Sequence, residues 1–101
     1  MYAVVRRIGF VPGAPARGAT ELETFRQVHE QQPGFIGSLD IDEGDGRHVI
    51  VNLWNSAAAA DAGRQAVGPV AVRTMQPLTT EPPELLAVGE VSTALSVRHP
   101  D

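Results

Sequence analysis

The stretch R-H-V-I-V-N-L-W-N-S, residues 47–56, decides the fold of this chain. Its valines, isoleucine and tryptophan are typical of a β-strand, and the serine at its end is a favourable helix N-cap. Because successive side chains of a strand point to opposite faces, this strand carries two sets of residues. The first set is His48, Ile50, Asn52 and Trp54, and the second set is Val49, Val51 and Leu53. Both faces of the strand are largely apolar, and both therefore need a cover.

The residues before this strand predict a strand, a loop, a helix and another strand. Residues 2–10 are rich in β-branched and aromatic residues, whereas the prolines and glycines of residues 11–18 predict a loop without helix or strand. Thr20 and Glu23 have the spacing of a capping box, which predicts a helix of about three turns that stops before Pro33. Residues 35–42 then partly alternate apolar and polar side chains, and E-G-D-G at 43–46 supplies a hairpin turn.

The residues that follow the strand in residues 47–56 predict a second helix and a last strand. Ser56 caps a helix through the alanines at 57–60, which Gly68 and Pro69 interrupt before one further turn over residues 70–75. The side of this helix expected to face the sheet carries only small residues, namely Ala59, Ala62, Gly63, Ala66 and Val67. After a proline-containing loop, residues 85–97 form the last strand, with a bulge at Gly89, and residues 98–101 form a tail.

The predicted order β-α-β-β-α-β is typical of an α+β, ferredoxin-like fold with a four-stranded antiparallel sheet. At 101 residues we expect a single domain over residues 1–101. Two helices cover only one face of such a sheet, so the set with Val49, Val51 and Leu53 lacks a cover. Leaving five or six such side chains in water forgoes on the order of 10 kcal/mol per subunit. We therefore predict a homodimer in which two sheets pair face to face as a dimeric α/β barrel.

The composition excludes several classes of function. The chain has no cysteine and no lysine, which excludes thiolate nucleophiles, thiolate metal sites and Schiff-base chemistry. All eight basic residues are arginines scattered along a chain of net charge −4, so nucleic acid is not an expected partner. The three histidines lack the paired spacing of metal ligands, and no metal site is expected.

The sequence also predicts a cytoplasmic protein without a membrane partner. No apolar run approaches the roughly 20 residues that span a bilayer. In M-Y-A-V-V-R-R the apolar residues precede the charges, which is the reverse of a secretory signal. The acidic segment D-I-D-E-G-D-G at 40–46 superficially matches a calcium loop, but Gly44 and Val51 occupy positions where ligands are required.

Three short motifs resemble the antibiotic biosynthesis monooxygenase-like family. They are P-G-F-I-G at 33–37, L-W-N-S at 53–56 and G-P-V at 68–70, and the resemblance covers nearly the whole chain. It implies the dimeric α/β barrel fold. Members of that family include oxygenases that act on polycyclic aromatic polyketides without metal or flavin, quinol monooxygenases and haem-degrading enzymes, so fold alone does not set the activity.

The resemblance also implies site residues. Trp54 takes the place of a tryptophan that lines the pocket between sheet and helices in the oxygenases, and Asn52 is the nearest candidate for their asparagine. Many members have a glutamate where Asn52 stands and a histidine on the second helix where Gly63 stands. Without that histidine, the haem-degrading branch loses its iron ligand. An asparagine of the first strand is replaced here by about Arg7.

These residues suit a cofactor-free monooxygenase that acts on an aromatic, polyketide-like or quinol molecule. Asn52 and Trp54 are the candidate catalytic residues, because an amide stabilises a developing enolate oxygen and an indole stacks on a ring system. The candidates for substrate binding are Arg7, His48, Arg64 and Arg73, and His48 is also the candidate general base. No cofactor is expected.

Two other functions stay open at this stage. A non-catalytic binding or accessory protein on the same fold is favoured by the missing helix histidine, and haem binding or degradation rests on the short motifs alone. Each site residue also has a structural reading, with Trp54 as a core residue, Asn52 as a strand tie and His48 as an exposed edge residue. The small residues above Trp54 permit either close packing or a cavity. Whether the loop from Pro12 to Ala19 closes over the site is also open.

Overall fold

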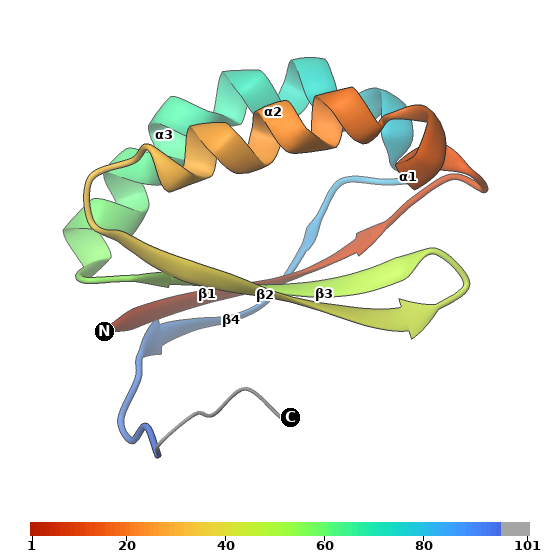
Figure 1. Cartoon of the computed structure of the whole chain (residues 1–101). Coiled ribbons are helices and arrows are strands. Elements are labelled where there is room, and N and C mark those ends of the chain that lie inside the picture. The colour runs from red at the N-terminus through yellow and green to blue at the C-terminus, as the bar shows by residue number, and fades with distance from the viewer. Residues whose placement is uncertain (96–101) are drawn as a thin grey trace, which may run out of the picture.

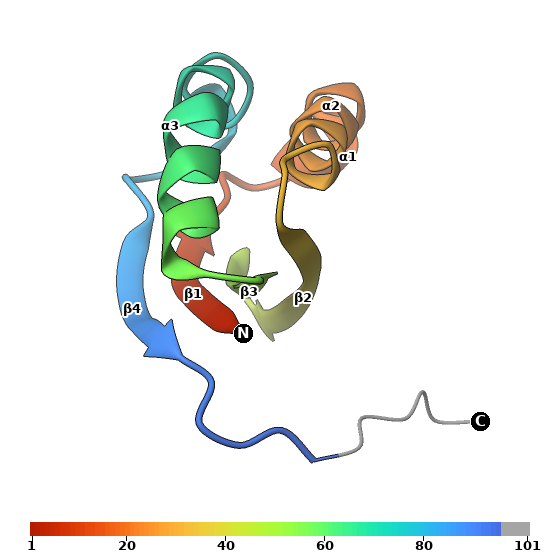
Figure 2. The same cartoon turned by 90° about the vertical axis from the view of Figure 1, so that its left-hand side faces the viewer.

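The computed structural model describes residues 1–95, so residues 96–97 of the predicted last strand and the tail at 98–101 lie outside them. The predicted last strand over 85–97 is too long, because the observed strand ends at Glu90 and residues 91–95 are not in a strand. The strands are β1 (Tyr2–Gly9), β2 (Phe35–Gly44), β3 (Arg47–Trp54) and β4 (Glu84–Glu90). The helices are α1 (Ala14–Arg17), α2 (Ala19–Glu30) and α3 (Ala57–Thr74), followed by a 3-10 turn over Gln76–Leu78. One antiparallel sheet in the order β2-β3-β1-β4 lies on one side, and the helices cover one of its faces (Figures 1 and 2). The predicted α+β, ferredoxin-like fold is confirmed.

The central pair of strands sets the two faces of the sheet. β1 pairs with β3 in an unbroken register from Tyr2 opposite Trp54 to Gly9 opposite Arg47. Asp45 and Gly46, which join β2 to β3, both have positive φ, as a two-residue hairpin turn requires, and Gly44 at the end of β2 also has positive φ. The side chains of His48, Ile50, Asn52 and Trp54 face the helices, as the alternation of the strand predicts.

The start of α3 follows the sequence prediction, but the break inside it does not form. The hydroxyl of Ser56 accepts a hydrogen bond from the amide of Ala59 at 3.0 Å, which confirms this residue as the N-cap. The predicted interruption at Gly68 and Pro69 is wrong, because α3 continues through Pro69 to Thr74. Pro69 and the residue one turn before it, Gln65, are both exposed, so the carbonyl that loses its amide partner can bond to water.

Three local predictions elsewhere in the chain are also wrong. The loop at 11–18 contains α1, whose Pro15 stands in the first turn, where its missing amide proton is not needed. Thr20 lies inside α2, and Gly18 holds the N-cap position without a side-chain bond, so the capping box does not form. The irregularity in β4 falls opposite the Val5 and Arg6 step, at Leu86 rather than at Gly89.

The core lies between the helices and the sheet and forms two small clusters. Val4, Trp54 and Ala60 form one, and Phe10, Ala14 and Met75 form the other. On α3 the buried residues are Ala60, Gly63 and Val67, whereas Ala62 and Ala66, which were expected to face the sheet, are exposed.

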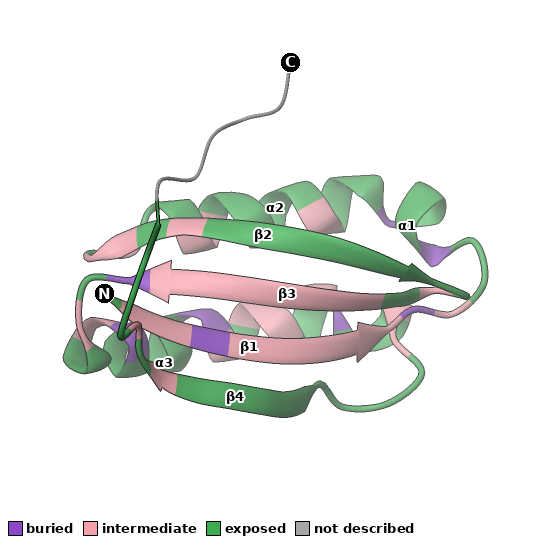
Figure 3. Cartoon of the chain, turned by 90° about the horizontal axis from the view of Figure 1, so that it is seen from below, coloured by how far each residue is buried: buried purple, intermediate pink, exposed green. Residues whose placement is uncertain are grey.

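Among residues 1–95, no helix or strand covers the opposite face of the sheet. Figure 3 shows this face with β2 and β4 mostly exposed and with β1 and β3 half-buried. On β2, Leu39 is 57% exposed and Ile41 is 51% exposed. Exposed apolar side chains side by side on a sheet are typical of an interface, so pairing through this face stays our prediction. Among the described residues, no helix is long and apolar enough to cross a membrane.

Candidate functional site

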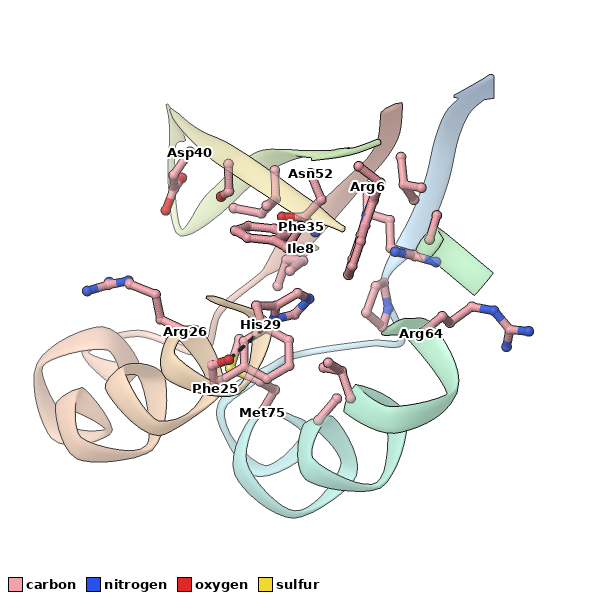
Figure 4. Close-up of a pocket in the computed structure, with 18 of the residues that line it drawn as sticks. Arg6, Ile8, Phe25, Arg26, His29, Phe35, Asp40, Asn52, Arg64 and Met75 are labelled. Atoms are coloured by element: carbon pink, nitrogen blue, oxygen red, sulfur yellow. Dashed lines mark hydrogen bonds between the residues drawn. The ribbon is translucent and has the colours of Figure 1, made fainter. Parts of the chain in front are cut away.

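A cleft of about 1130 Å³ lies between the sheet and the helices α2 and α3. Its walls are mainly apolar and come from all four strands and all three helices. The side chains used below are those of Arg6, His29, Phe35, His48, Asn52, Trp54 and Arg64, all of which line it. Figure 4 shows His29 and Phe35 in the middle of the cleft, with Arg26 and Arg64 at opposite sides. A cleft of this size, apolar with a few polar groups, is typical of small-molecule sites.

Trp54 is both a core residue and a lining residue of this cleft. It is only 3% exposed, forms a T-shaped pair with the ring of Phe35 at a centroid distance of 5.2 Å, and belongs to the buried cluster with Val4 and Ala60. A Cβ atom added to Gly63 would overlap the indole ring, so Trp54 fills the space beside α3 at this position.

Replacing Gly63 with alanine is expected to lower the free energy of unfolding by about 1–3 kcal/mol, because overpacking against a buried ring forces strain. Urea denaturation of the purified protein measures this. Gly68→Ala is the matched control on the same helix, since an added Cβ there meets no atom within 4 Å. A Gly63→Ala protein as stable as the wild type would show that Trp54 is free to move away from α3.

Asn52 supplies an unengaged amide on the floor of the cleft. It stands on β3 between Ser38 of β2 and Val4 of β1, in one row across the sheet. Within residues 1–95 its side chain makes no hydrogen bond, so it does not act there as a strand tie. Its N–H and C=O groups remain available to a ligand.

His29 is a cleft residue that the sequence analysis did not select. Its ring lies 4.6 Å from that of Phe25, 6.0 Å from Phe35 and 6.5 Å from Trp54, measured between centroids. Nδ1 donates a hydrogen bond to the backbone carbonyl of Phe25 at 3.3 Å, which leaves Nε2 of the neutral ring as a proton acceptor. His29 lies four residues after Phe25, so the two share one side of α2, and this spacing could have identified His29 as a residue that faces the sheet.

The surroundings keep the imidazole of His29 neutral near pH 7. Burial lowers its pKa below the ordinary value of 6.5, the hydrogen bond to Phe25 opposes this shift, and the positive charge of Arg6 adds to it. A neutral imidazole with a free Nε2 beside an apolar cleft is suited to accept a proton from a bound molecule.

His48, the predicted general base, lies at the other end of the cleft. Its Nδ1 is 2.7 Å from a carboxylate oxygen of Asp40, and its ring packs edge-on against Phe10 at 5.2 Å. It is 18% exposed, so it is not a solvated edge residue. It precedes Trp54 by six positions on β3, which corresponds to about 20 Å along a strand. It is therefore far from Trp54, whereas the ring of His29 lies 6.5 Å from that of Trp54.

Of the three arginines predicted to bind substrate, only Arg64 lines the cleft, which Arg6 and Arg26 also line. Arg6, not Arg7, faces the cleft, and it is half-buried. Arg7 lies on the opposite face, where it donates to Glu43 at 2.8 Å and lies 3.6 Å from Glu84, and these partners raise its pKa. Arg64 lies at the rim of the cleft, paired with Asp61 at 2.9 Å. The exposed Arg73 does not line the cleft, so neither Arg7 nor Arg73 is brought to it.

Over residues 1–95, no three histidine, aspartate or glutamate side chains gather closely enough to hold a metal ion. No protein-family model matches the chain, and no curated protein matches its sequence.

Several solved structures share the fold. A mutant of SnoaB, a cofactor-independent oxygenase from Streptomyces nogalater, matches with a TM-score of 0.75 and 21% identity over 93% of this chain and 95% of that one. A putative antibiotic biosynthesis monooxygenase from Nitrosomonas europaea matches with a TM-score of 0.74 and 14% identity over 92% and 100%. A mutant of MhuD with two manganese protoporphyrin IX molecules bound per active site matches with a TM-score of 0.72 and 22% identity over 96% and 100%. The resemblance noted from the motifs is thus supported at the level of the fold.

Proposed function

We propose that this chain belongs to the antibiotic biosynthesis monooxygenase-like family and oxygenates an aromatic, polyketide-like or quinol molecule in its cleft without a cofactor. The observation that carries the proposal is that one apolar cleft holds both an amide without a hydrogen bond among residues 1–95, on Asn52, and an imidazole whose Nε2 is free, on His29. The shared fold with SnoaB, described as a cofactor-independent oxygenase, supports it.

The chemistry requires an electron-rich anion of the substrate. Nε2 of His29 takes a proton from an enolisable carbon or a hydroxyl of the ligand, and the N–H of Asn52 hydrogen-bonds the enolate oxygen that develops. The apolar walls of the cleft exclude water from this anion. The anion then reduces dioxygen, so that one oxygen atom enters the ring as a carbonyl and the other leaves as water with two hydrogens from the substrate. No outside reductant is needed.

The proposal includes the assembly of the protein. Residues 1–101 form one domain, and two chains pair through the face of the sheet that the helices leave bare, where Leu39 and Ile41 are exposed. We propose that this dimer is cytoplasmic and that its ligand is a small molecule, without a nucleic-acid or membrane partner.

A second candidate is a non-catalytic binding protein with the same cleft. The observation that favours it is Gly63, where the packed ring of Trp54 replaces the histidine of relatives. The same packing disfavours haem degradation, because α3 offers no ligand to iron at that place.

Trp54 is the only tryptophan, so its fluorescence separates these candidates. Anthrone is added without oxygen, and saturable quenching is expected as it enters the cleft. Oxygen is then admitted, and we expect uptake with formation of anthraquinone. Quenching without uptake would favour the binding protein, and absence of quenching with both anthrones and quinols would contradict both candidates.

A further inference from the structure

Arg6 is the charged group of the cleft that the proposed chemistry does not use. It stands in the middle of the sheet on β1, opposite Ile50 of β3 and Leu85 of β4, and its side chain is half-buried among the apolar residues that face the helices. Burial and the nearby charge of Arg64 lower the pKa of its guanidinium. An arginine nevertheless stays charged at neutral pH.

The carboxylates that line the cleft do not neutralise this charge. Asp40 is hydrogen-bonded to His48, and Asp61 is paired with Arg64. Glu30, at the end of α2, is exposed. Over residues 1–95, Arg6 has neither a salt bridge nor a side-chain hydrogen bond, in contrast to Arg7 beside it, which has two carboxylate partners.

A half-buried guanidinium without a partner is costly, since it gives up hydration without gaining a counter-charge. The cost is recovered when an anionic oxygen enters the cleft and accepts hydrogen bonds from the planar fork of the guanidinium. The apolar walls around it strengthen such a bond, because water does not screen it.

We propose that Arg6 binds an anionic oxygen of the ligand, so that the cleft selects ring-bearing small molecules that carry a carboxylate or an ionised ring hydroxyl. This inference rests on the proposed function only in placing the ligand in the cleft. It adds the charge class of that ligand and assigns a residue to recognise it.

Isothermal titration calorimetry with a matched pair of probes tests the inference. 1-Naphthoate and 1-naphthamide have nearly the same shape and differ in charge. Wild-type protein is expected to bind naphthoate about 10-fold more tightly or better, as a charge-assisted hydrogen bond provides. Arg6→Gln is expected to remove this preference and to change the affinity for naphthamide less than about 2-fold. Arg6→Lys is expected to retain part of the preference for naphthoate.

Arg7→Gln is the matched control, since it removes an arginine from the adjacent position on the other face. It is expected to retain the preference for naphthoate. Equal affinity of the wild type for both probes, binding of neither probe, or an equal loss of both probes in Arg6→Gln would overturn the inference.

A further probe separates the two kinds of anionic oxygen. 4-Nitrophenol absorbs visible light in its ionised form, so a lowered pKa of the bound phenol in wild type but not in Arg6→Gln indicates recognition of a ring oxyanion. Binding of naphthoate alone indicates a carboxylate. Oxygen uptake with neutral anthrone and no preference for anions would support the proposed function and contradict this inference. Arg6-dependent binding of anions without oxygen uptake would support this inference and contradict the proposed oxygenation.

Discussion

Replacing His29 with glutamine is expected to lower the rate constant for oxygenation of anthrone near pH 7 by about 100-fold or more, as loss of a general base does. Glutamine keeps a polar side chain able to donate to the carbonyl of Phe25, the bond that His29 makes at 3.3 Å. It cannot accept the proton. Binding of anthrone measured without oxygen is expected to change little, so the loss falls on the chemical step.

His48→Gln gives the comparison within the same cleft. Because His48 lies at the far end and is bonded to Asp40, we expect its replacement to lower the rate by at most about 10-fold. If His48→Gln removed activity and His29→Gln did not, the base would be His48, as the sequence alone predicted.

The pH profile gives a separate check on His29. Burial lowers its pKa below 6.5, so the neutral, base form persists to a lower pH than for a histidine in water. The rate is therefore expected to be constant near neutrality and to fall with acid only below pH 6.5. This acid limb is expected to disappear in the residual activity of His29→Gln. A limb that survives in the variant would belong to another group.

Replacing Val51 with aspartate is expected to dissociate the predicted dimer, raising its Kd by about 100-fold or more, because an unpaired charge enters an apolar interface. Val51 lies at the centre of the uncovered face, opposite Val5 of β1 and Leu39 of β2. Sedimentation velocity of the purified proteins measures the assembly.

Val72→Asp is the matched control, because Val72 is 61% exposed on α3, away from that face. It is expected to leave the dimer intact. Leu39→Asp provides a second test on the same face at a residue that is 57% exposed in the single chain, where the fold itself tolerates a charge. A monomeric wild-type protein, or a dimer unaffected by both Val51→Asp and Leu39→Asp, would contradict pairing through the sheet.

Local patterns were sufficient to predict the fold. The alternation of β3, the glycines of the hairpin turn and the cap at Ser56 each depend on neighbouring residues, and each is confirmed. The uninterrupted α3 was not predictable in this way. A proline breaks a helix where the freed carbonyl is buried, and the exposure of Pro69 follows only from the packing of the whole chain.

The site was predictable only in part, because the sequence does not determine which side of β1 and which side of α2 face the cleft. Both sides of β1 carry apolar residues, so its pattern did not distinguish Arg6 from Arg7. On α2 the cleft is lined by His29 and not by its apolar neighbour Val28. Adjacent residues of a helix lie about 100° apart, so a small rotation of the helix decides which of them faces inward.

The central claim, oxygenation without a cofactor, is tested most directly by the ratio of dioxygen consumed to anthraquinone formed by protein freed of metals with a chelator. We predict one dioxygen for each anthraquinone, a rate proportional to the protein concentration, and no uptake with an anthrone whose reactive carbon is blocked by two methyl groups. Uptake that requires added metal or flavin, or that does not exceed the spontaneous oxidation of anthrone, would contradict the account.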